Sequence, residues 1–275
     1  MKKKFEKRRI ILKIPFVRRY YYKYLRGFAR KHKDLELITT ITRGIIMNLT
    51  LKDAVQYMLF IDDVYEPHET SLWLNYSKNS STIIDIGANV GYYSLLAASV
   101  NKAARIISFE PISKTYNRFV ENIEMNSYKN ITAVRNAVSN KSETIRINLG
   151  NENNWGMSSI NQHDYLSGSY EDIESVTLDE YVKNNCINGV DLIKIDIEGA
   201  EFYALLGMRN ILEEMSPVIF VEVLEQHLSK QNISIEKVFS FLWDFGYKSY
   251  TIGKNNKLSE LSAPISVDGL ILFKK

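Results

Sequence analysis

The sequence of 275 residues predicts an α/β fold of the doubly wound type, in which helices cover both faces of a mostly parallel sheet. Short runs rich in isoleucine and valine alternate with helical patterns from Thr82 onward, and strands buried on both faces consist of such apolar runs. The first run leads into a turn with two glycines. Because ligands of doubly wound sheets bind at the carboxyl ends of the strands, we expect the binding site at that turn.

The predicted elements follow one another in the order that such a sheet requires. Apolar runs predict the strands, and apolar residues spaced three and four apart predict the helices. The expected strands are 82–86, 105–109, 131–136, 191–197, 218–223, 247–252 and 270–273, and the expected helices are 92–100, 114–126, 202–212 and 235–245. No helix separates the last two strands, so we expect one of them to run antiparallel to the rest.

Charge divides the chain into a basic arm and an acidic body. Residues 2–33 contain 14 lysines and arginines against one acid, Glu6, a net charge of +13. The whole chain carries +3, which leaves −10 for the remainder. We therefore distinguish a basic amphipathic arm (1–33), a cap region (34–80) and the main α/β domain (81–275).

The arm is predicted to form a basic amphipathic helix after Pro15, because its apolar residues recur four apart and lysines and arginines fill the other side. Such a helix can lie on an anionic membrane, where each basic residue contributes on the order of 1 kcal/mol. Its apolar stripe can instead pack on the protein's own body. RNA contact is a third interpretation, although no RNA-binding module is present.

The cap region combines two short patterns. β-Branched residues on either side of Arg43 and Gly44 predict a small hairpin, and residues 50–53 are typical of a helix start. A second short helix is expected from residues 65–70 onward. These elements precede the main sheet and are expected to lie over its edge or mouth.

Several classes of protein are excluded by composition. The single cysteine, Cys186, cannot form a disulfide framework or a zinc cage, and the four histidines lack zinc-site spacing. No apolar run approaches the roughly 20 residues of a membrane-spanning helix. We expect a cytoplasmic protein, peripheral to the inner membrane face if the arm binds lipid.

The glycine turn after the first strand has the sequence Asp85-Ile-Gly87-Ala-Asn89-Val-Gly91. Glycines allow a tight turn and a close approach of backbone, and the following helix offers unpaired amides. The dinucleotide fingerprint requires G-x-G-x-x-G, whereas the spacing here is G-x-N-x-G. The turn therefore does not match the NAD fingerprint, and an NAD-dependent reductase is a less favoured alternative.

A second acid, Glu110, ends the next strand ahead of Pro111. An acid there can accept hydrogen bonds from both ribose hydroxyls; alternatively, it only favours the following helix N-terminus. Two acids without a phosphate-binding lysine favour a cationic nucleoside, and S-adenosylmethionine, with its sulfonium and amino groups, fits. By position in the sheet, Asn136 and Ala137 are expected at the adenine edge.

Carboxylates concentrate at the carboxyl ends of two later strands. Alternation in 191–197 predicts that Lys194, Asp196 and Glu198 share one face of the strand, and Glu222 ends the next strand. Buried charges need partners or a role. We expect Asp196 at the cofactor pocket and Asp196, Glu198 and Glu222 on the catalytic rim. The alternative is a structural ion pair of Lys194 with Asp196 or Glu198, with Glu201 favouring a helix start.

These motifs together resemble the FkbM-type methyltransferase family over about residues 65–222, most specifically in KIDIEGAE at 194–201. The resemblance implies a Rossmann-like class I methyltransferase sheet of seven strands with S-adenosylmethionine as cofactor. It also implies methyl transfer to a hydroxyl oxygen, in members that act on surface-polysaccharide sugars and natural products. It assigns the cofactor loop to Asp85, Gly87, Asn89 and Gly91, the ribose acid to Glu110, and the Asp-x-Glu-Gly block to Asp196, Glu198 and Gly199.

The leading hypothesis is an O-methyltransferase for a sugar hydroxyl in a surface glycan or lipid-linked glycan intermediate. An alcohol must lose its proton as it attacks, so a base is needed. We expect Asp196, with Glu198 or Glu222 beside it, because close carboxylates raise each other's pKa. These acids could instead hold a divalent cation, but we favour a site without metal.

Three alternatives stay open at this stage. An RNA methyltransferase would use the same core with the arm as its grip on a polyanion, although the Asn-Pro-Pro-[Tyr/Phe] motif of amino methylation is absent and nucleic acid is the less favoured partner. A natural-product O-methyltransferase would keep the same chemistry. A membrane-bound scaffold with an inactive cofactor fold would bind no S-adenosylmethionine.

Overall fold

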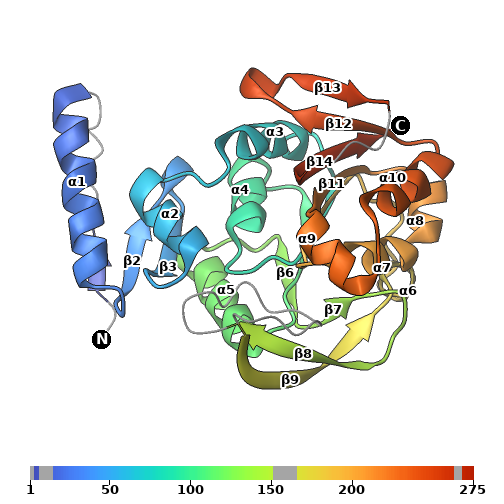
Figure 1. The fold of residues 1–275 in the computed structure, drawn as a ribbon, viewed down its shortest axis with the longest axis horizontal. Helices are drawn as coiled ribbons and strands as arrows, with labels where there is room; N and C mark the ends of the chain where they lie inside the picture. Colours follow the sequence, from blue (N-terminus) through green and yellow to red (C-terminus); the bar gives the residue numbers. More distant parts are fainter. Residues whose placement is uncertain (1–2, 6–14, 151–165, 263–267) are drawn as a thin grey trace.

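An eight-stranded sheet forms the centre of the computed structural model, which describes residues 3–5, 15–150, 166–262 and 268–275 (Figure 1). The strand order is β13-β12-β14-β11-β10-β4-β5-β6. The strands from β6 to β11 in this order are parallel, and β14 runs antiparallel to both of its neighbours. The doubly wound α/β prediction is confirmed, including the antiparallel strand near the C-terminus.

The strands lie close to their predicted positions, with one addition. Seven strands were expected, and the hairpin strand β13 adds an eighth at the edge beside β12. The third and fourth strands end earlier than expected, at Val134 and Ile195. The bounds are β4 Thr82–Ile86, β5 Arg105–Phe109, β6 Ile131–Val134, β10 Leu192–Ile195, β11 Val218–Val223, β12 Lys248–Ile252, β13 Leu258–Leu261 and β14 Gly269–Lys274.

Helices pack on both faces of this sheet because its buried residues alternate. Ile83, Ile106 and Leu192 join the core under α3 Pro67–Ser77, α4 Tyr92–Val100 and α5 Ser113–Asn126. Their neighbours along each strand join the core on the opposite face, under α6 Leu178–Asn184, α7 Glu201–Leu206, α8 Arg209–Glu214 and α10 Ile235–Asp244.

The prediction of a single helix over 202–212 is wrong, because the structure has two helices there. Gly207 lies between α7 and α8, and a Cβ atom at that position would lie 2.0 Å from the carbonyl oxygen of Ser139. Close packing against another segment therefore interrupts a pattern that is continuous in the sequence.

The cap region contains the predicted hairpin and both helices. Strands β2 Glu36–Thr40 and β3 Ile46–Thr50 are joined by the 3-10 turn η2 Thr42–Gly44. Helix α2 Ala54–Asp62 begins at Asp53, whose side chain accepts a hydrogen bond from the amide of Gln56. A third strand, β1 Lys3–Phe5, pairs in parallel with β2 and was not predicted.

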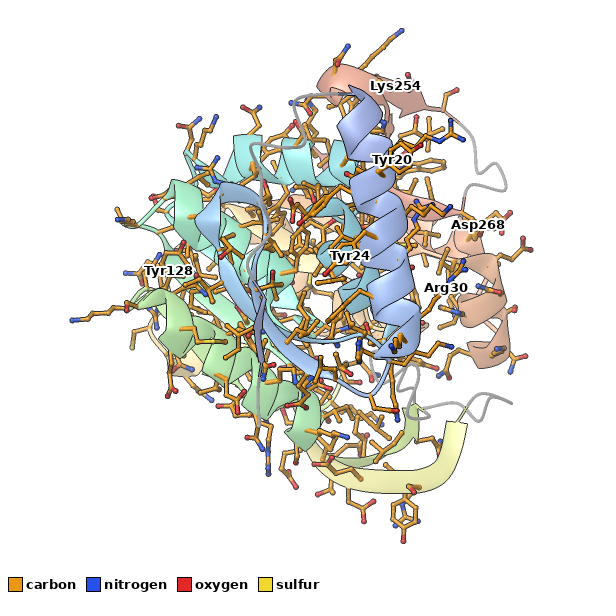
Figure 2. The ribbon with its side chains drawn as sticks, turned by 90° about the vertical axis from the view of Figure 1, so that its left-hand side faces the viewer. Tyr20, Tyr24, Arg30, Tyr128, Lys254 and Asp268 are labelled. Atoms are coloured by element: carbon orange, nitrogen blue, oxygen red, sulfur yellow. The ribbon has the colours of Figure 1, made fainter. Side chains whose placement is uncertain are left out.

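The arm forms the helix α1 Pro15–Lys31, which runs alongside the cap region (Figures 1 and 2). Leu25 and Ala29 are buried in the core that the cap shares with one face of the sheet. The ring of Phe28 lies 6.1 Å from that of Phe60 on α2. The apolar stripe thus packs on the protein's own body, as one interpretation expected, and the basic side remains exposed.

A small sheet of strands β7 Ala137–Val138, β9 Leu166–Val176 and β8 Thr144–Gly150 flanks the main one. The sequence analysis did not predict it. The loop expected over 151–170 falls outside the described residues up to 165, and from Leu166 it is strand β9 instead. The remaining elements are α9 Glu225–Leu228, η4 Ser229–Gln231 and η5 Lys254–Asn256. In the described part of the chain, no helix is long and apolar enough to cross a membrane.

Candidate active site

A cavity of about 340 Å³ opens at the carboxyl ends of β4, β5, β10 and β11. The cap region contributes Asp53, Ala54, Val55 and Tyr65 to its wall, so the cap lies over its mouth, as expected. All of the predicted site residues except Gly91 and Gly199 line this one cavity: Asp85, Gly87, Asn89, Glu110, Asn136, Ala137, Asp196, Glu198 and Glu222.

The turn between β4 and α4 packs closely against neighbouring segments because its glycines have no side chains. Gly87 has a φ of +84°, and a Cβ atom there would lie 1.9 Å from the carbonyl oxygen of Asp196. Gly91 has a φ of +91°, and a Cβ atom there would lie 2.2 Å from the ring of Phe119. The glycines therefore seat the turn on the loop after β10 and on α5, which explains why Gly91 lies outside the cavity.

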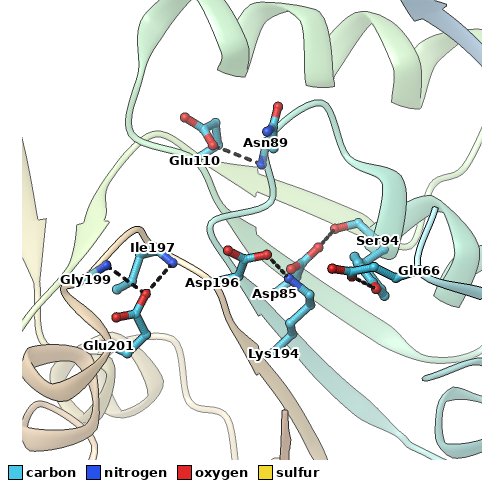
Figure 3. Close-up of polar contacts among 11 residues, drawn as sticks. Glu66, Asp85, Asn89, Ser94, Glu110, Lys194, Asp196, Ile197, Gly199 and Glu201 are labelled. Atoms are coloured by element: carbon cyan, nitrogen blue, oxygen red, sulfur yellow. Dashed lines mark hydrogen bonds and ion pairs between the residues drawn. The ribbon is translucent and has the colours of Figure 1, made fainter. Parts of the chain in front are cut away.

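Glu110 is fixed by two backbone amides at the edge of the cavity, and Figure 3 shows the contact with Asn89. Its Oε2 accepts a hydrogen bond from Asn89 N, and its Oε1 accepts one from Ile112 N, both at 3.0 Å. Ile112 is the residue before α5, so Glu110 supports the helix start and also lines the cavity. Burial raises the pKa of Glu110 to about 7, against the two amide hydrogen bonds.

Asn136 and Ala137 line the cavity beside apolar residues. The neighbouring wall includes Ile112, Val138, Ile145 and Ile147. The side-chain amide of Asn136 donates a hydrogen bond to the carbonyl oxygen of Glu174, at 3.1 Å. This apolar part of the wall is suited to a flat aromatic group.

Asp85 and Lys194 lie side by side because their strands are in register, with Lys194 opposite Asp85 and Asp85 opposite Ser108. Oδ2 of Asp85 accepts a hydrogen bond from Ser94 Oγ at 2.5 Å, and Ser94 Oγ lies 2.8 Å from Ser108 Oγ. Oδ1 of Asp85 is buried and accepts no hydrogen bond from any residue that the structure describes. Asp85 thus brings an unused acceptor to the cavity wall.

Lys194 is the central cation of the site, with its side chain 2% exposed. Its Nζ lies 2.5 Å from Oδ2 of Asp196 (Figure 3). The same atom lies 4.5 Å from the ring centroid of Tyr93. Burial favours the neutral amine, but the carboxylates of Asp196, Asp85 and Glu66 outweigh it and raise the pKa of Lys194. The expected alternative of a Lys194–Asp196 ion pair is therefore present within the candidate site.

Asp196 and Glu222 form a carboxyl pair next to Lys194. Burial opposes ionisation of Asp196, but Lys194 and a hydrogen bond with Glu222 keep its pKa below the usual range. Burial and the charge of Asp196 raise the pKa of Glu222 to about 11. The two pKa shifts run in opposite directions, so the pair favours sharing one proton, with Glu222 holding it more strongly than Asp196.

The strand alternation predicted that Glu198 shares the face of Lys194, and this prediction is wrong. Strand β10 ends at Ile195, and Glu198 has a left-handed φ of 55°. Its carboxylate instead lies against His227 of α9, with Oε2 at 3.0 Å from Nδ1. Oε1 of the buried Glu201 accepts hydrogen bonds from the amides of Ile197 and Gly199, at 3.0 and 3.1 Å. Glu201 thus fixes the loop that carries Asp196 and Glu198.

Sequence reasoning missed several residues of this site. His227 has no local motif and follows Glu198 by 29 residues. Tyr65 and Tyr93 also line the cavity, and no sequence pattern reveals that they pack there. Tyr93 Oη donates a hydrogen bond to Glu66 Oε2 at 2.6 Å. One signal was available in the sequence. Asp85 and Lys194 are charged residues within predicted buried strands, and buried charges need a partner of opposite charge.

Residues 85–249 match the family model described as the methyltransferase FkbM domain. The chain belongs to the FkbM methyltransferase family. Among curated proteins it is similar to the hexuronic acid methyltransferase AglP of Haloferax volcanii, with 24% identity over 54% of this chain and 58% of AglP. It is also similar to Methyltransferase 1 of Beauveria bassiana, with 21% identity over 66% of this chain and 78% of that protein.

This FkbM-family chain spans only part of two of its curated relatives, 58% of AglP and 9% of the antimetabolite synthetase AmbE of Pseudomonas aeruginosa, to which it is 24% identical. Among solved structures, an FkbM methyltransferase from Methylobacillus flagellatus KT aligns over 94% of this chain and 71% of that one, with 13% identity and a TM-score of 0.46.

The methyl donor of an FkbM domain is S-adenosylmethionine, and the cavity fits this cation. Its wall contains six acids and a single lysine, Lys194, which is already paired with Asp196. The unused Oδ1 of Asp85 can accept a hydrogen bond, and Glu110 can accept from ribose hydroxyls. The prediction of S-adenosylmethionine as the cofactor, made from the acids Asp85 and Glu110, is therefore confirmed.

Proposed function

We propose that this protein is an S-adenosylmethionine-dependent O-methyltransferase whose acceptor is a sugar hydroxyl in a surface glycan or lipid-linked glycan intermediate. The observation that carries the proposal is the acidic rim of the cavity, where Asp196, Glu198 and Glu222 meet Tyr65 of the cap. Carboxylates accept hydrogen bonds from vicinal hydroxyls, and an aromatic ring packs on the apolar face of a sugar. The resemblance to a hexuronic acid methyltransferase supports a sugar acceptor.

The roles of the cavity residues follow from their positions. Glu110 is proposed to accept from the ribose hydroxyls, while Asn136 and Ala137 border the adenine. Gly87, Asn89 and Gly91 shape the turn, and Asp85 and Asp196 face the cationic end of the donor. When bound, S-adenosylmethionine supplies a methyl group on a positively charged sulfur, and the protein's task is to hold the acceptor oxygen in line with it, within about 3.5 Å.

An acceptor screen with labelled methyl donor tests this function. Nucleotide sugars, lipid-linked oligosaccharides, purified surface glycan and total RNA are offered in parallel, and the labelled product is hydrolysed and identified. We expect an O-methyl sugar. Label confined to RNA would refute the glycan proposal and favour the alternative RNA methyltransferase, whereas label on a small aromatic or polyketide hydroxyl would favour a natural-product enzyme.

The pKa of Glu110 predicts how cofactor binding depends on pH. A carboxyl with a pKa of about 7 is partly protonated in the ligand-free protein at neutral pH, whereas ribose hydroxyls and a cation favour the carboxylate. Binding should therefore release a proton, and affinity should fall below pH 7 by up to tenfold per pH unit.

Calorimetry in buffers of different ionisation enthalpy measures this proton release directly. Close to one proton per cofactor is expected at pH 6 and close to none at pH 8.5. The Glu110→Gln variant should bind more weakly and show a flatter pH dependence, while Glu143→Gln, at an exposed position, should match the wild type. Unchanged proton release in Glu110→Gln would contradict the role of Glu110.

We also propose that the arm, residues 1–33, contacts an anionic membrane surface. Leu25 and Ala29 anchor α1 to the cap, while Tyr20 and Tyr24 are 60% and 57% exposed (Figure 2). A shallow groove beside α1 is lined by four exposed basic residues, Arg19, Lys23, Arg26 and Arg30. This arrangement favours lipid headgroups, because the helix is held firmly with its charges outward.

Vesicle co-sedimentation tests the arm. Replacing Arg19, Lys23 and Arg26 with glutamate should weaken binding to phosphatidylglycerol-containing vesicles on the order of 100-fold. Reversing three exposed body lysines, Lys102, Lys129 and Lys183, provides the control and should have a much smaller effect. Tight RNA binding without vesicle binding would overturn the membrane proposal.

A further inference from the structure

His227 lies on the wall of the cavity, where α9 meets the loop after β10. Its Nδ1 is 3.0 Å from Oε2 of Glu198, and the two side chains are 6% and 18% exposed. A carboxylate beside Nδ1 orients the imidazole and decides which ring nitrogen carries the proton. With the proton on Nδ1, Nε2 is the nitrogen that can accept another one.

The backbone on both sides of this pair is shaped for the contact. Glu198 has a left-handed φ of 55°, and the next residue, Gly199, has a φ of +104°. A Cβ atom on Gly199 would lie 2.8 Å from the carbonyl oxygen of His227, so the loop and α9 pack with no space for a side chain. The start of α9 is fixed as well, because the amide of Glu225 donates to Oδ1 of Asp268 at 2.9 Å.

The carboxyl pair expected to provide the base is poorly suited to that task. Asp196 is ionised, but its charge is neutralised by Lys194 at 2.5 Å and by the hydrogen bond with Glu222. Glu222 already carries a proton at neutral pH. Glu110 also has a pKa near 7, but both of its oxygens accept hydrogen bonds from backbone amides at the turn after β4 and the start of α5. That leaves His227 as the residue beside the acidic rim whose chemistry suits proton removal near neutral pH.

We propose that His227 is the general base for the acceptor hydroxyl and that Glu198 is its positioning residue, which rests on the O-methyl transfer proposed above. Nε2 of His227 takes the hydroxyl proton as the acceptor oxygen forms its bond to the methyl carbon, and the electron pair of the broken carbon–sulfur bond stays on sulfur. The products are a methyl ether, the neutral thioether and an imidazolium that Glu198 stabilises. Asp196 and Glu222 then serve to hold the acceptor rather than to deprotonate it.

The charges around His227 decide the pH at which it works. The carboxylate of Glu198, 3.0 Å from Nδ1, raises the pKa of His227 against the effect of burial, and the charge of Glu201 adds to the increase while Lys230 opposes it. Asp196 also lies within electrostatic reach. Since the base must be neutral, kcat should rise with pH through a pKa above 6.5 and then level off.

Two variants separate the base from its positioning residue. His227→Asn places an amide nitrogen near the Nδ1 position, so the contact with Glu198 can be kept while the proton acceptor is lost. We expect kcat to fall at least 100-fold and the dissociation constant of S-adenosylmethionine to change less than threefold. Glu198→Gln should lower kcat and move the acidic limb of the pH profile to lower pH. His68→Gln, on α3, is the matched histidine control and should leave both unchanged.

A measurement that does not depend on the acceptor checks the dyad itself. Imidazole signals followed by NMR across a pH titration should give His227 a pKa above 6.5 that falls in Glu198→Gln, while His68 is unaffected. Full activity in a folded His227→Asn protein, combined with loss of activity in Asp196→Asn, would overturn the proposal in favour of Asp196. If the wild type instead methylates a nitrogen or carbon atom, the O-methyl proposal fails whether or not the NMR result holds.

Discussion

Replacing Lys194 with methionine is expected to destabilise the protein by about 3–5 kcal/mol, because it leaves buried carboxylates without their counter-charge. Lys194 is 2% exposed and pairs with Asp196 at 2.5 Å, and its positive charge also offsets the burial of Asp85 and Glu66. Methionine keeps the volume of the aliphatic stem, so the loss measures charge rather than packing. Denaturant unfolding gives the free energy, and calorimetry should show cofactor binding weakened as well.

The pH dependence of this variant distinguishes charge from packing. Without Lys194, Asp85 and Asp196 can relieve the buried charge by binding protons, so the destabilisation should shrink at low pH and grow as the pH rises. A purely steric effect would be the same at every pH. Lys102→Met, which removes an exposed lysine, should change the stability by no more than about 0.5 kcal/mol. Equal stability of Lys194→Met and the wild type at pH 8 would contradict the central role of this cation.

The fold was predictable because its signals are local. The central strands β4, β5, β6, β10 and β11 are short runs dominated by apolar residues, and the turn at Gly87 marks the site whichever helices surround it. Strand β9 escaped prediction because it contains many polar and charged residues, such as Glu171, Asp172 and Glu174. Strand β8 does alternate Ile145, Ile147 and Leu149 with polar residues, and this signal was overlooked. Their stability comes from pairing with each other in the antiparallel ladder, which a single stretch of sequence does not reveal.

The candidate site was predictable in its cofactor half and less so in its acceptor half. Asp85 and Glu110 belong to strand ends whose position follows from the topology. Glu198, by contrast, was assigned to a strand face by alternation, and its left-handed backbone turns it toward His227 instead. That contact depends on how a distant helix packs, so no spacing rule could find it. The roles assigned to Asp196, Glu198 and Glu222 stay predictions until the variants are measured.

Gly87→Ala is the second substitution expected to have a large effect, and it tests how the cofactor turn is held. An alanine Cβ at this position would lie 1.9 Å from the carbonyl oxygen of Asp196, which belongs to backbone and cannot rotate away. The left-handed φ of +84° adds strain of about 1–2 kcal/mol. The turn must therefore move, and with it the cradle formed with Asp196. We expect loss of measurable S-adenosylmethionine binding together with a lower free energy of unfolding.

Gly246→Ala separates the two contributions, because Gly246 has nearly the same φ, +82°, but nothing within 4 Å of its added Cβ. That control should lose only the strain of about 1–2 kcal/mol and bind the cofactor like the wild type. The difference between the two variants isolates the contact of the turn with the loop after β10. If Gly87→Ala bound S-adenosylmethionine as tightly as Gly246→Ala, the close packing of Gly87 against Asp196 could not be what shapes the cofactor site, and the link between the cofactor turn and the acidic rim would have to be abandoned.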